Sequence, residues 1–252
     1  MRGLLNEQRH ELHKQAVSKA FGAIAPFYDS WYESPLGRYV WLVETAAIEA
    51  LMPVHIIGVC VEIGIGTGMA LDILKPVSST IVAVDISWQM LTLAYRKIQA
   101  DPLVHLALAD GENLPFRQNV MSLAFGMTVL EFVPNPKKIL SEVYRCLHPA
   151  GWLVLGILTS TNVWALERRI RNLVAPDVFS YARFSSPWQI TRMLHQSGFS
   201  IVKSRGSVYA PSFTPQGWLS KFAQLDEVLG TRALTRSLGA FFCVQARRSS
   251  SR

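Results

Sequence analysis

Residues 59–70 read VCVEIGIGTGMA, and this stretch decides the fold class expected for the chain. A short hydrophobic strand ends in Glu62, and the chain then turns through Gly64, Gly66 and Gly68. Glycine lets a backbone turn sharply and lets a ligand approach without meeting a Cβ atom. The dinucleotide fingerprint G-x-G-x-x-G is not met, because position 69 is methionine. We therefore expect a ligand-binding turn of another type at the end of this strand.

Strand-like and helical segments alternate across residues 54–158. This alternation is typical of βαβ units that build a parallel sheet buried on both faces. Ser87 is placed to cap one helix, and the pair Asn135 and Pro136 is placed to begin another. The strands expected in this part cover residues 57–63, 80–85, 104–109, 120–128 and 152–158.

The rest of the chain continues the pattern less regularly. Ser186 and Gln189 predict a capping box at the start of a helix that Gly198 ends. Two further strands are expected, and two intervals rich in aromatic residues are expected to cap the carboxyl edge of the sheet, where open α/β folds bind ligands. The strands cover residues 200–209 and 239–247, and the intervals are 159–185 and 210–238.

Length and composition favour one domain over residues 1–252. We expect an N-terminal helical cap at 1–52, a ligand-binding core at 53–158, and an acceptor-side cap with the last two strands at 159–252. The charged N-terminus lacks the apolar region of a secretory signal, and no apolar run reaches the ~20 residues that span a bilayer. The three cysteines have neither disulfide nor metal-ligand spacing. We therefore expect a cytoplasmic protein that holds no metal.

The formal net charge of +7 is compatible with an anionic partner, either nucleic acid or lipid headgroups. The basic residues are scattered, however, and their densest run is Arg168, Arg169 and Arg171. Solvated helix faces explain such runs more simply than a binding patch. We therefore expect no nucleic-acid partner and keep a peripheral membrane contact as a hypothesis.

Acidic side chains follow three strands of the expected sheet. Asp85 ends the strand after the glycine turn, seventeen residues beyond Gly68, where a carboxylate can accept the hydroxyl groups of a ribose. Asp110, Gly111 and Glu112 follow the next strand, where an acidic side chain can accept a hydrogen bond from an adenine amino group. The spacing predicts an adenosine-containing ligand without naming it.

Several segments together resemble the signature segments of the type 11 methyltransferases, which include the ubiquinone and menaquinone biosynthesis enzymes. In order they are the pair Tyr28 and Asp29, VEIGIGTG, VAVDISWQML, ALADGENLPF and FGMTVLEFVPNPKKILSEVYRCLHPAGWLVL. The resemblance covers roughly residues 21–158. It implies an S-adenosylmethionine-dependent enzyme with a Rossmann-like seven-stranded sheet, mostly parallel with an antiparallel last strand, and helices on both faces.

The resemblance also implies a cofactor role for fourteen residues. Glu62 and the turn would surround the methionine moiety, Asp85 the ribose, and Ile86 and Met90 the adenine. The implied cofactor-binding residues are Tyr28, Glu62, Gly64, Ile65, Gly66, Thr67, Gly68, Asp85, Ile86, Met90, Asp110, Gly111, Glu112 and Met127. Tyr28 can equally belong to an aromatic core cluster.

The sequence constrains the identity of the methyl acceptor less than that of the cofactor. We expect a small, apolar or lipid-like molecule, because the cap intervals are rich in aromatic residues and the family includes quinone methyltransferases. Candidate acceptor-pocket residues are Phe179, Tyr181, Arg183, Phe184 and Trp188, with Trp164 and Trp218 as further candidates, although core packing explains them nearly as well. A general base could be His195, Tyr28, Tyr181 or Glu131, and Arg38 could meet an anionic group.

Three alternatives remain open at this point. A nicotinamide-dependent oxidoreductase is disfavoured by the missing third fingerprint glycine. A nucleic-acid methyltransferase of the type that modifies base amino groups is disfavoured because Gly126, Met127, Thr128 and Val129 stand where such enzymes carry an N/D-P-P-Y/F run. A binding module that keeps the fold but lacks transfer activity has no distinguishing sequence feature.

Overall fold

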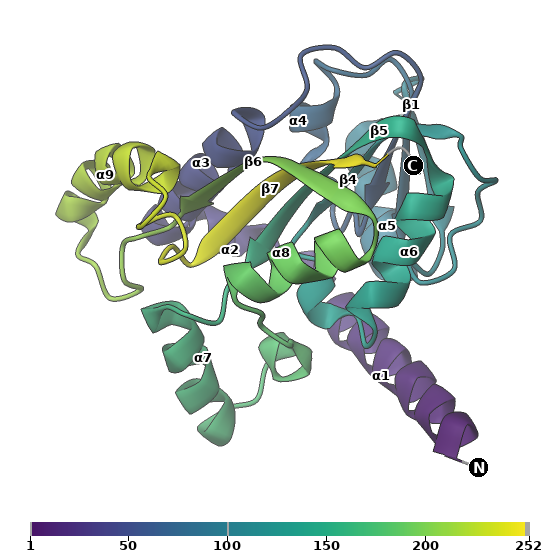
Figure 1. Ribbon diagram of the computed structural model, residues 1–252. Helices are drawn as coiled ribbons and strands as arrows, with labels where there is room; N and C mark the ends of the chain where they lie inside the picture. Colours follow the sequence, from purple (N-terminus) through teal and green to yellow (C-terminus); the bar gives the residue numbers. More distant parts are fainter. Residues whose placement is uncertain (1, 100, 250–252) are drawn as a thin grey trace.

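The computed structural model describes residues 2–99 and 101–249, arranged around one twisted sheet (Figure 1). The seven strands follow the order β3-β2-β1-β4-β5-β7-β6. Neighbouring strands from β3 to β5 pair in parallel, and β7 is antiparallel to both β5 and β6. The predicted fold class is confirmed. Residues 1 and 250–252 of the expected domain lie outside the described residues.

The strands lie where the sequence predicts them, within a few residues. They are β1 (Val59–Ile63), β2 (Ile81–Asp85), β3 (Val104–Leu108), β4 (Met121–Met127), β5 (Leu147–Leu158), β6 (Phe199–Ser207) and β7 (Phe241–Arg248). Only β5 differs strongly, since it begins five residues before the expected 152. The reason is packing: Leu147 pairs with Met121 of β4, and both side chains are fully buried.

Helices cover both faces of the sheet and bury one hydrophobic cluster on each. Helices α3 (Pro35–Glu49), α4 (Leu71–Leu74), α5 (Trp88–Ile98) and α9 (Leu219–Thr231) contribute to the first cluster. The second lies under α6 (Pro136–Cys146) and α8 (Pro187–Gln196), which cross the near face in Figure 1. Alternating strand residues, such as Cys60 and Val61, point to opposite clusters, as the pleat of a strand requires.

The helix ends follow the expected capping chemistry. The side chains of Ser87 and Asn135 accept hydrogen bonds from the third residue along, and Ser186 forms a complete capping box with Gln189. Gly198 has a φ of +87° directly after α8, which is the left-handed conformation that ends a helix. These local signals fix the register of the helices against the strands.

The remaining segments lie outside the sheet layers. Helix α1 (Arg2–Ile24) projects from the molecule, followed by η1 (Ala25–Phe27) and α2 (Ser30–Glu33). The interval 159–185 forms α7 (Val163–Val174) and η3 (Val178–Tyr181), and the interval 210–238 forms η4 (Gln216–Trp218) and α9. Helix α9 packs against α3 and β6 at the margin of the sheet. Within the described ranges, no helix combines the length and apolarity that crossing a membrane requires.

Candidate functional site

A cavity opens at the carboxyl ends of β1, β2 and β4, directly under α1 and η1. Twelve of the fourteen predicted cofactor residues line it. They are Tyr28, Glu62, Gly64, Ile65, Gly66, Thr67, Asp85, Ile86, Met90, Asp110, Gly111 and Met127. Gly68 and Glu112 do not line it. The strand ends thus gather residues from positions 28 to 127 around one space, as the parallel topology predicts.

Two glycines of the turn have different tasks. Gly66 has a φ of +56°, and a Cβ atom built on it would meet no protein atom within 4 Å. Its bare backbone therefore faces open space in the cavity. Gly68 has a φ of +85°, and its Cβ would contact Leu71 and Ala94 in the protein interior. Gly68 thus lies outside the cavity lining, where it lets the chain enter α4, and its cofactor contact stays a prediction.

Asp85 ties the glycine turn to the next strand. Its carboxylate accepts hydrogen bonds from the backbone N–H of Gly66, at 2.9 Å, and of Ser87, at 2.8 Å. Burial raises the pKa of Asp85, and these backbone donors oppose that rise. Each carboxylate oxygen has a second lone pair, so the group can also accept from a ligand hydroxyl.

Glu62 is the unsatisfied acid of the cavity. Its side chain is 1% exposed, and Oε2 has no hydrogen-bond partner. Burial, with a smaller effect of the nearby Asp85 charge, raises the pKa of Glu62 to about 8. A buried carboxylate without a partner is costly, so a cation or hydrogen-bond donor placed in the cavity would be bound favourably.

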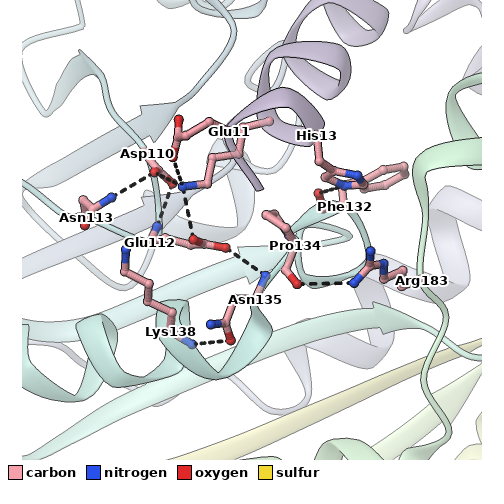
Figure 2. A network of polar contacts seen from close by, with 11 residues as sticks. Glu11, His13, Asp110, Glu112, Asn113, Phe132, Pro134, Asn135, Lys138 and Arg183 are labelled. Atoms are coloured by element: carbon pink, nitrogen blue, oxygen red, sulfur yellow. Dashed lines mark hydrogen bonds and ion pairs between the residues drawn. The ribbon is translucent and has the colours of Figure 1, made fainter. Parts of the chain in front are cut away.

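An ion-pair network closes the cavity beside Asp110, and Figure 2 shows its acidic residues. Lys14 of α1 donates to Asp110 at 2.7 Å and lies 3.1 Å from Glu112 Oε2. Burial alone would raise the pKa of Asp110, but the hydrogen bond from Lys14 and that from the Glu112 backbone N–H lower it. Glu112 is 2% exposed and accepts from the Asn135 backbone N–H. In this structure Glu112 holds Lys14 and lies outside the cavity lining, and its cofactor contact stays a prediction.

Helix α1 forms the roof of the cavity and belongs to the N-terminal helical cap expected at 1–52, but its cavity-lining residues were not predicted. Lys14, Val17 and Phe21 line the cavity from one face of the helix. On the far side His13 hydrogen-bonds to the Phe132 carbonyl at 3.1 Å, as Figure 2 shows. The spacing of three and four residues between Lys14, Val17 and Phe21 is the sequence signal that could have identified this face of α1.

Tyr28 lines the cavity beside the glycine turn. The next residue, Asp29, accepts a 2.6 Å hydrogen bond from the Thr67 hydroxyl and so ties η1 to the turn. Burial raises the pKa of Tyr28 to about 12. The phenol is therefore protonated at neutral pH, and Tyr28 is a poor general base there, although its ring can still face a cation.

The candidates for the acceptor pocket do not line this cavity. The cavity lining includes none of Phe179, Tyr181, Arg183, Phe184, Trp188, Trp164 and Trp218. His195 and Arg38 are exposed, so neither reaches the cavity. Two of the candidates contact residues that line the cavity: Arg183 Nη1 donates to the Pro134 carbonyl at 3.5 Å, and the ring of Phe179 lies 6.1 Å from that of Phe132. The cavity itself is lined by α1 and by none of the residues in the intervals 159–185 and 210–238.

A family profile described as a methyltransferase domain matches residues 61–155. This match spans the glycine turn, Asp85, Asp110 and the end of β4. The chain carries a methyltransferase domain of the type 11 family. The expected family is confirmed, and with it the class of cofactor, S-adenosylmethionine.

Three comparisons place this methyltransferase domain among its relatives. An uncharacterized protein of Mycobacterium tuberculosis is 31% identical over 198 residues, which cover 79% of this chain and 66% of that protein. A malonyl-[acyl-carrier protein] O-methyltransferase of a Marinomonas species is 24% identical over 94% of this chain and 96% of its own length. A crystal structure from Thermotoga maritima, of a possible histamine N-methyltransferase, matches with a TM-score of 0.71 at 23% identity. It covers 92% of this chain and 100% of that chain and shows the same fold.

The cavity of the methyltransferase domain suits S-adenosylmethionine chemically. The unpartnered Oε2 of Glu62 can accept from an ammonium group, and Asp85 can accept from ribose hydroxyls. The empty space in front of Gly66 leaves room for a ligand against the backbone. When bound, this cofactor supplies an electrophilic methyl group.

Proposed function

We propose that this chain transfers a methyl group from S-adenosylmethionine to a small, apolar or lipid-like acceptor. One observation carries the proposal: bare backbone at Gly66 and the unpartnered carboxylate of Glu62 line the same cavity. The first admits an adenosyl group, and the second complements the cationic amino group of its methionine part. The names of two relatives, a malonyl-[acyl-carrier protein] and a ubiquinone biosynthesis O-methyltransferase, support an oxygen acceptor joined to an apolar or lipid-related molecule.

The chain's own residues contribute mainly by positioning. In the transfer the S–CH3 bond breaks, its electron pair stays on sulfur, and the acceptor atom forms the new bond to carbon. Tyr28 and Phe21 exclude water from the cavity, and Met127 lies at the end of β4 beside it. A neutral acceptor must also lose a proton. Of the proposed bases only Tyr28 lines the cavity, while Glu131 directly precedes the lining residue Phe132 and itself lies outside the lining.

Calorimetric titration tests the cofactor. We expect saturable binding of S-adenosylhomocysteine and none of NADH. Saturable binding of NADH alone would favour the oxidoreductase reading, and heat from neither ligand in well-folded protein would end the proposal. Incubation with a cell extract and labelled S-adenosylmethionine then separates an enzyme from a silent binding module, because only an enzyme moves label into an acceptor pool.

We also infer a contact with anionic membranes through α7. This helix turns an apolar stripe toward solvent, while Trp164 and Ala165 face the protein. The exposed stripe consists of Val163, Leu166, Ile170, Leu173 and Val174. At about 3.6 residues per turn, Arg169 and Arg171 flank it on either side. An apolar face bordered by arginines is typical of helices that lie in a membrane interface.

Co-sedimentation with vesicles of phosphatidylcholine and phosphatidylglycerol tests this contact at low and high salt. We expect Leu173→Asp to reduce the bound fraction severalfold. Leu234→Asp is the matched control, because Leu173 and Leu234 are 85% and 90% exposed and Leu234 lies outside α7. Equal binding by both variants, or none by the native chain at either salt concentration, would contradict a role of α7 at the membrane.

A further inference from the structure

Two side chains of opposite charge near the end of β5, Glu131 and the partly buried Arg168, each have one buried polar atom without a hydrogen-bond partner. In the described part of the chain, four buried side-chain polar atoms lack a hydrogen-bond partner, and two of them are Glu131 Oε2 and Arg168 Nη1. No ion pair within 4.0 Å joins these two described residues. Folded proteins rarely leave such atoms unsatisfied. Together they indicate a place prepared for a polar group from outside the chain.

Aromatic rings surround the Arg168 guanidinium. Its central carbon lies 4.5 Å from the ring centroid of Phe179, 5.5 Å from that of Trp164 and 5.7 Å from that of Phe184. We call this arrangement the Arg168 box. Stacking against ring faces holds the planar guanidinium in place while leaving its N–H groups free to donate along the plane. An arginine fixed in this way suits the two oxygens of a carboxylate.

The carboxyl groups of Glu44 and Glu131 near the box do not cancel the positive charge of Arg168 at neutral pH. Burial raises the pKa of Glu44 to about 8, against an opposing effect of Arg168. Burial likewise raises the pKa of Glu131 to about 7, even though the Leu158 backbone N–H donates to Oε1. At pH 7 Glu44 is therefore mostly protonated and Glu131 about half protonated. Arg168 keeps most of its positive charge, and protonated acids can donate hydrogen bonds to an incoming anion.

The box adjoins the cofactor cavity. Phe132 lines that cavity, and its ring centroid is 6.1 Å from that of Phe179, which forms one wall of the box. Glu131 precedes Phe132 and binds the last residue of β5, Leu158. The carboxyl ends of β4 and β5 are thus shared by the cavity and the box. An apolar molecule anchored in the box would pass along Phe132 toward the transferred methyl group.

We propose that the Arg168 box binds a carboxylate on the methyl acceptor, so that the acceptor is an apolar molecule bearing one acidic group. This rests on the proposed methyl transfer and narrows its substrate class. The carboxylate pairs with the Arg168 guanidinium, Glu131 and Glu44 complete its hydrogen bonds, and the apolar remainder packs against Phe132. It also gives a function to the aromatic residues of the interval 159–185.

Binding of octanoate and of the isosteric neutral octanamide to protein saturated with S-adenosylhomocysteine tests the assignment. We expect the native chain to bind octanoate at least about tenfold more tightly than octanamide. Arg168→Gln should remove this preference, and Arg168→Lys should keep part of it because the charge remains. Arg169→Gln is the matched control, since Arg169 is the next residue of the same helix, is exposed and has no contact with the three rings of the box.

The outcomes separate this inference from the proposed function. Urea unfolding and S-adenosylhomocysteine affinity are measured first for each variant, which shows that the fold and the cofactor site persist. Failure of S-adenosylhomocysteine to bind would remove the proposed function, while octanoate binding could still be measured. If the cofactor binds normally, any of three results would overturn the proposed carboxylate site at the Arg168 box. These are no saturable octanoate binding by the native chain, equal affinity for octanoate and octanamide, or equal losses of octanoate affinity in Arg168→Gln and Arg169→Gln.

Discussion

The carboxyl edge of the sheet has two halves that are built differently. At the ends of β2 and β3, Asp85 and Asp110 are satisfied by backbone N–H groups and by Lys14. At the ends of β4 and β5, Glu131 and Arg168 keep unpartnered atoms. The first half is organised before any ligand arrives. The second half contains buried polar atoms that the described protein leaves without partners, as a site for the proposed methyl acceptor would.

Glu62 of β1 forms the boundary between these halves. It belongs to the cofactor cavity, yet its Oε2 is unpartnered and its pKa is raised to about 8. The ammonium group of S-adenosylmethionine would explain that exception under the proposed function. No cofactor group explains Glu131 and Arg168, because they stand behind Phe132 and outside the cavity lining. The comparison therefore predicts that changes in the first half alter cofactor affinity and changes in the second half do not.

The largest effect is expected at Gly66. Gly66→Val places a branched side chain in the empty space of the cavity and should reduce S-adenosylhomocysteine affinity at least about 1,000-fold, or roughly 4 kcal/mol. The left-handed φ of +56° adds a stability cost of roughly 1–2 kcal/mol. Gly217→Val is the control, because its Cβ also meets no atom within 4 Å but lies in η4. If calorimetry found normal S-adenosylhomocysteine affinity in Gly66→Val, the proposal that the cofactor binds in the cavity at Gly66 would be contradicted.

The cofactor half could be predicted from the sequence because its residues lie in continuous motifs. Glu62 to Thr67 follow one strand, and Asp85 and Asp110 end the next two, so parallel topology alone brings them together. The second half could not be predicted in this way. Glu44, Glu131 and Arg168 come from α3, η2 (Leu130–Phe132) and α7, and no local pattern links them.

The cavity-lining residues of helix α1 could not be predicted for a related reason, although an N-terminal helical cap was expected. Its cavity-lining face of Lys14, Val17 and Phe21 repeats at helical spacing, but Lys14 interrupts the apolar pattern. A lysine at such a position is usually exposed, and here it is buried only because Asp110 and Glu112 pair with it across 96 and 98 residues of chain. Long-range partners of this kind are visible only in the folded structure.

The second prediction concerns pH and the acceptor half. The pKa of Glu131 is raised from its ordinary value of 4.5 to about 7, so the folded state holds a proton that the unfolded state loses. Its contribution to stability is present below pH 4.5 and is lost as the pH rises to 7. Relative to the native chain, Glu131→Gln should therefore gain roughly 3 kcal/mol between pH 4.5 and 8, measured by urea unfolding.

Glu142→Gln is a control of opposite sign. The hydrogen bond from Arg145 lowers the pKa of Glu142, so its contribution is present above the ordinary carboxyl pKa and is lost as the pH falls. The Gln variant should lose stability relative to the native chain as the pH rises from acid. Parallel pH profiles for the native chain and Glu131→Gln would contradict the buried, unsatisfied state of Glu131. Cofactor affinity should stay unchanged in Glu131→Gln.

The smallest effect, about tenfold to thirtyfold in S-adenosylhomocysteine affinity, is expected for Asp85→Asn. An amide keeps one oxygen for the Gly66 or Ser87 N–H but loses the charge that strengthens hydrogen bonds from ribose hydroxyls. Asp101→Asn is a matched control, because Asp101 also accepts from the N–H two residues ahead, that of Leu103, yet lies outside the cavity. Its affinity should equal that of the native chain. If Asp85→Asn also bound normally, Asp85 would serve only to hold the turn, and the ribose would have to be recognised by another group of the cavity.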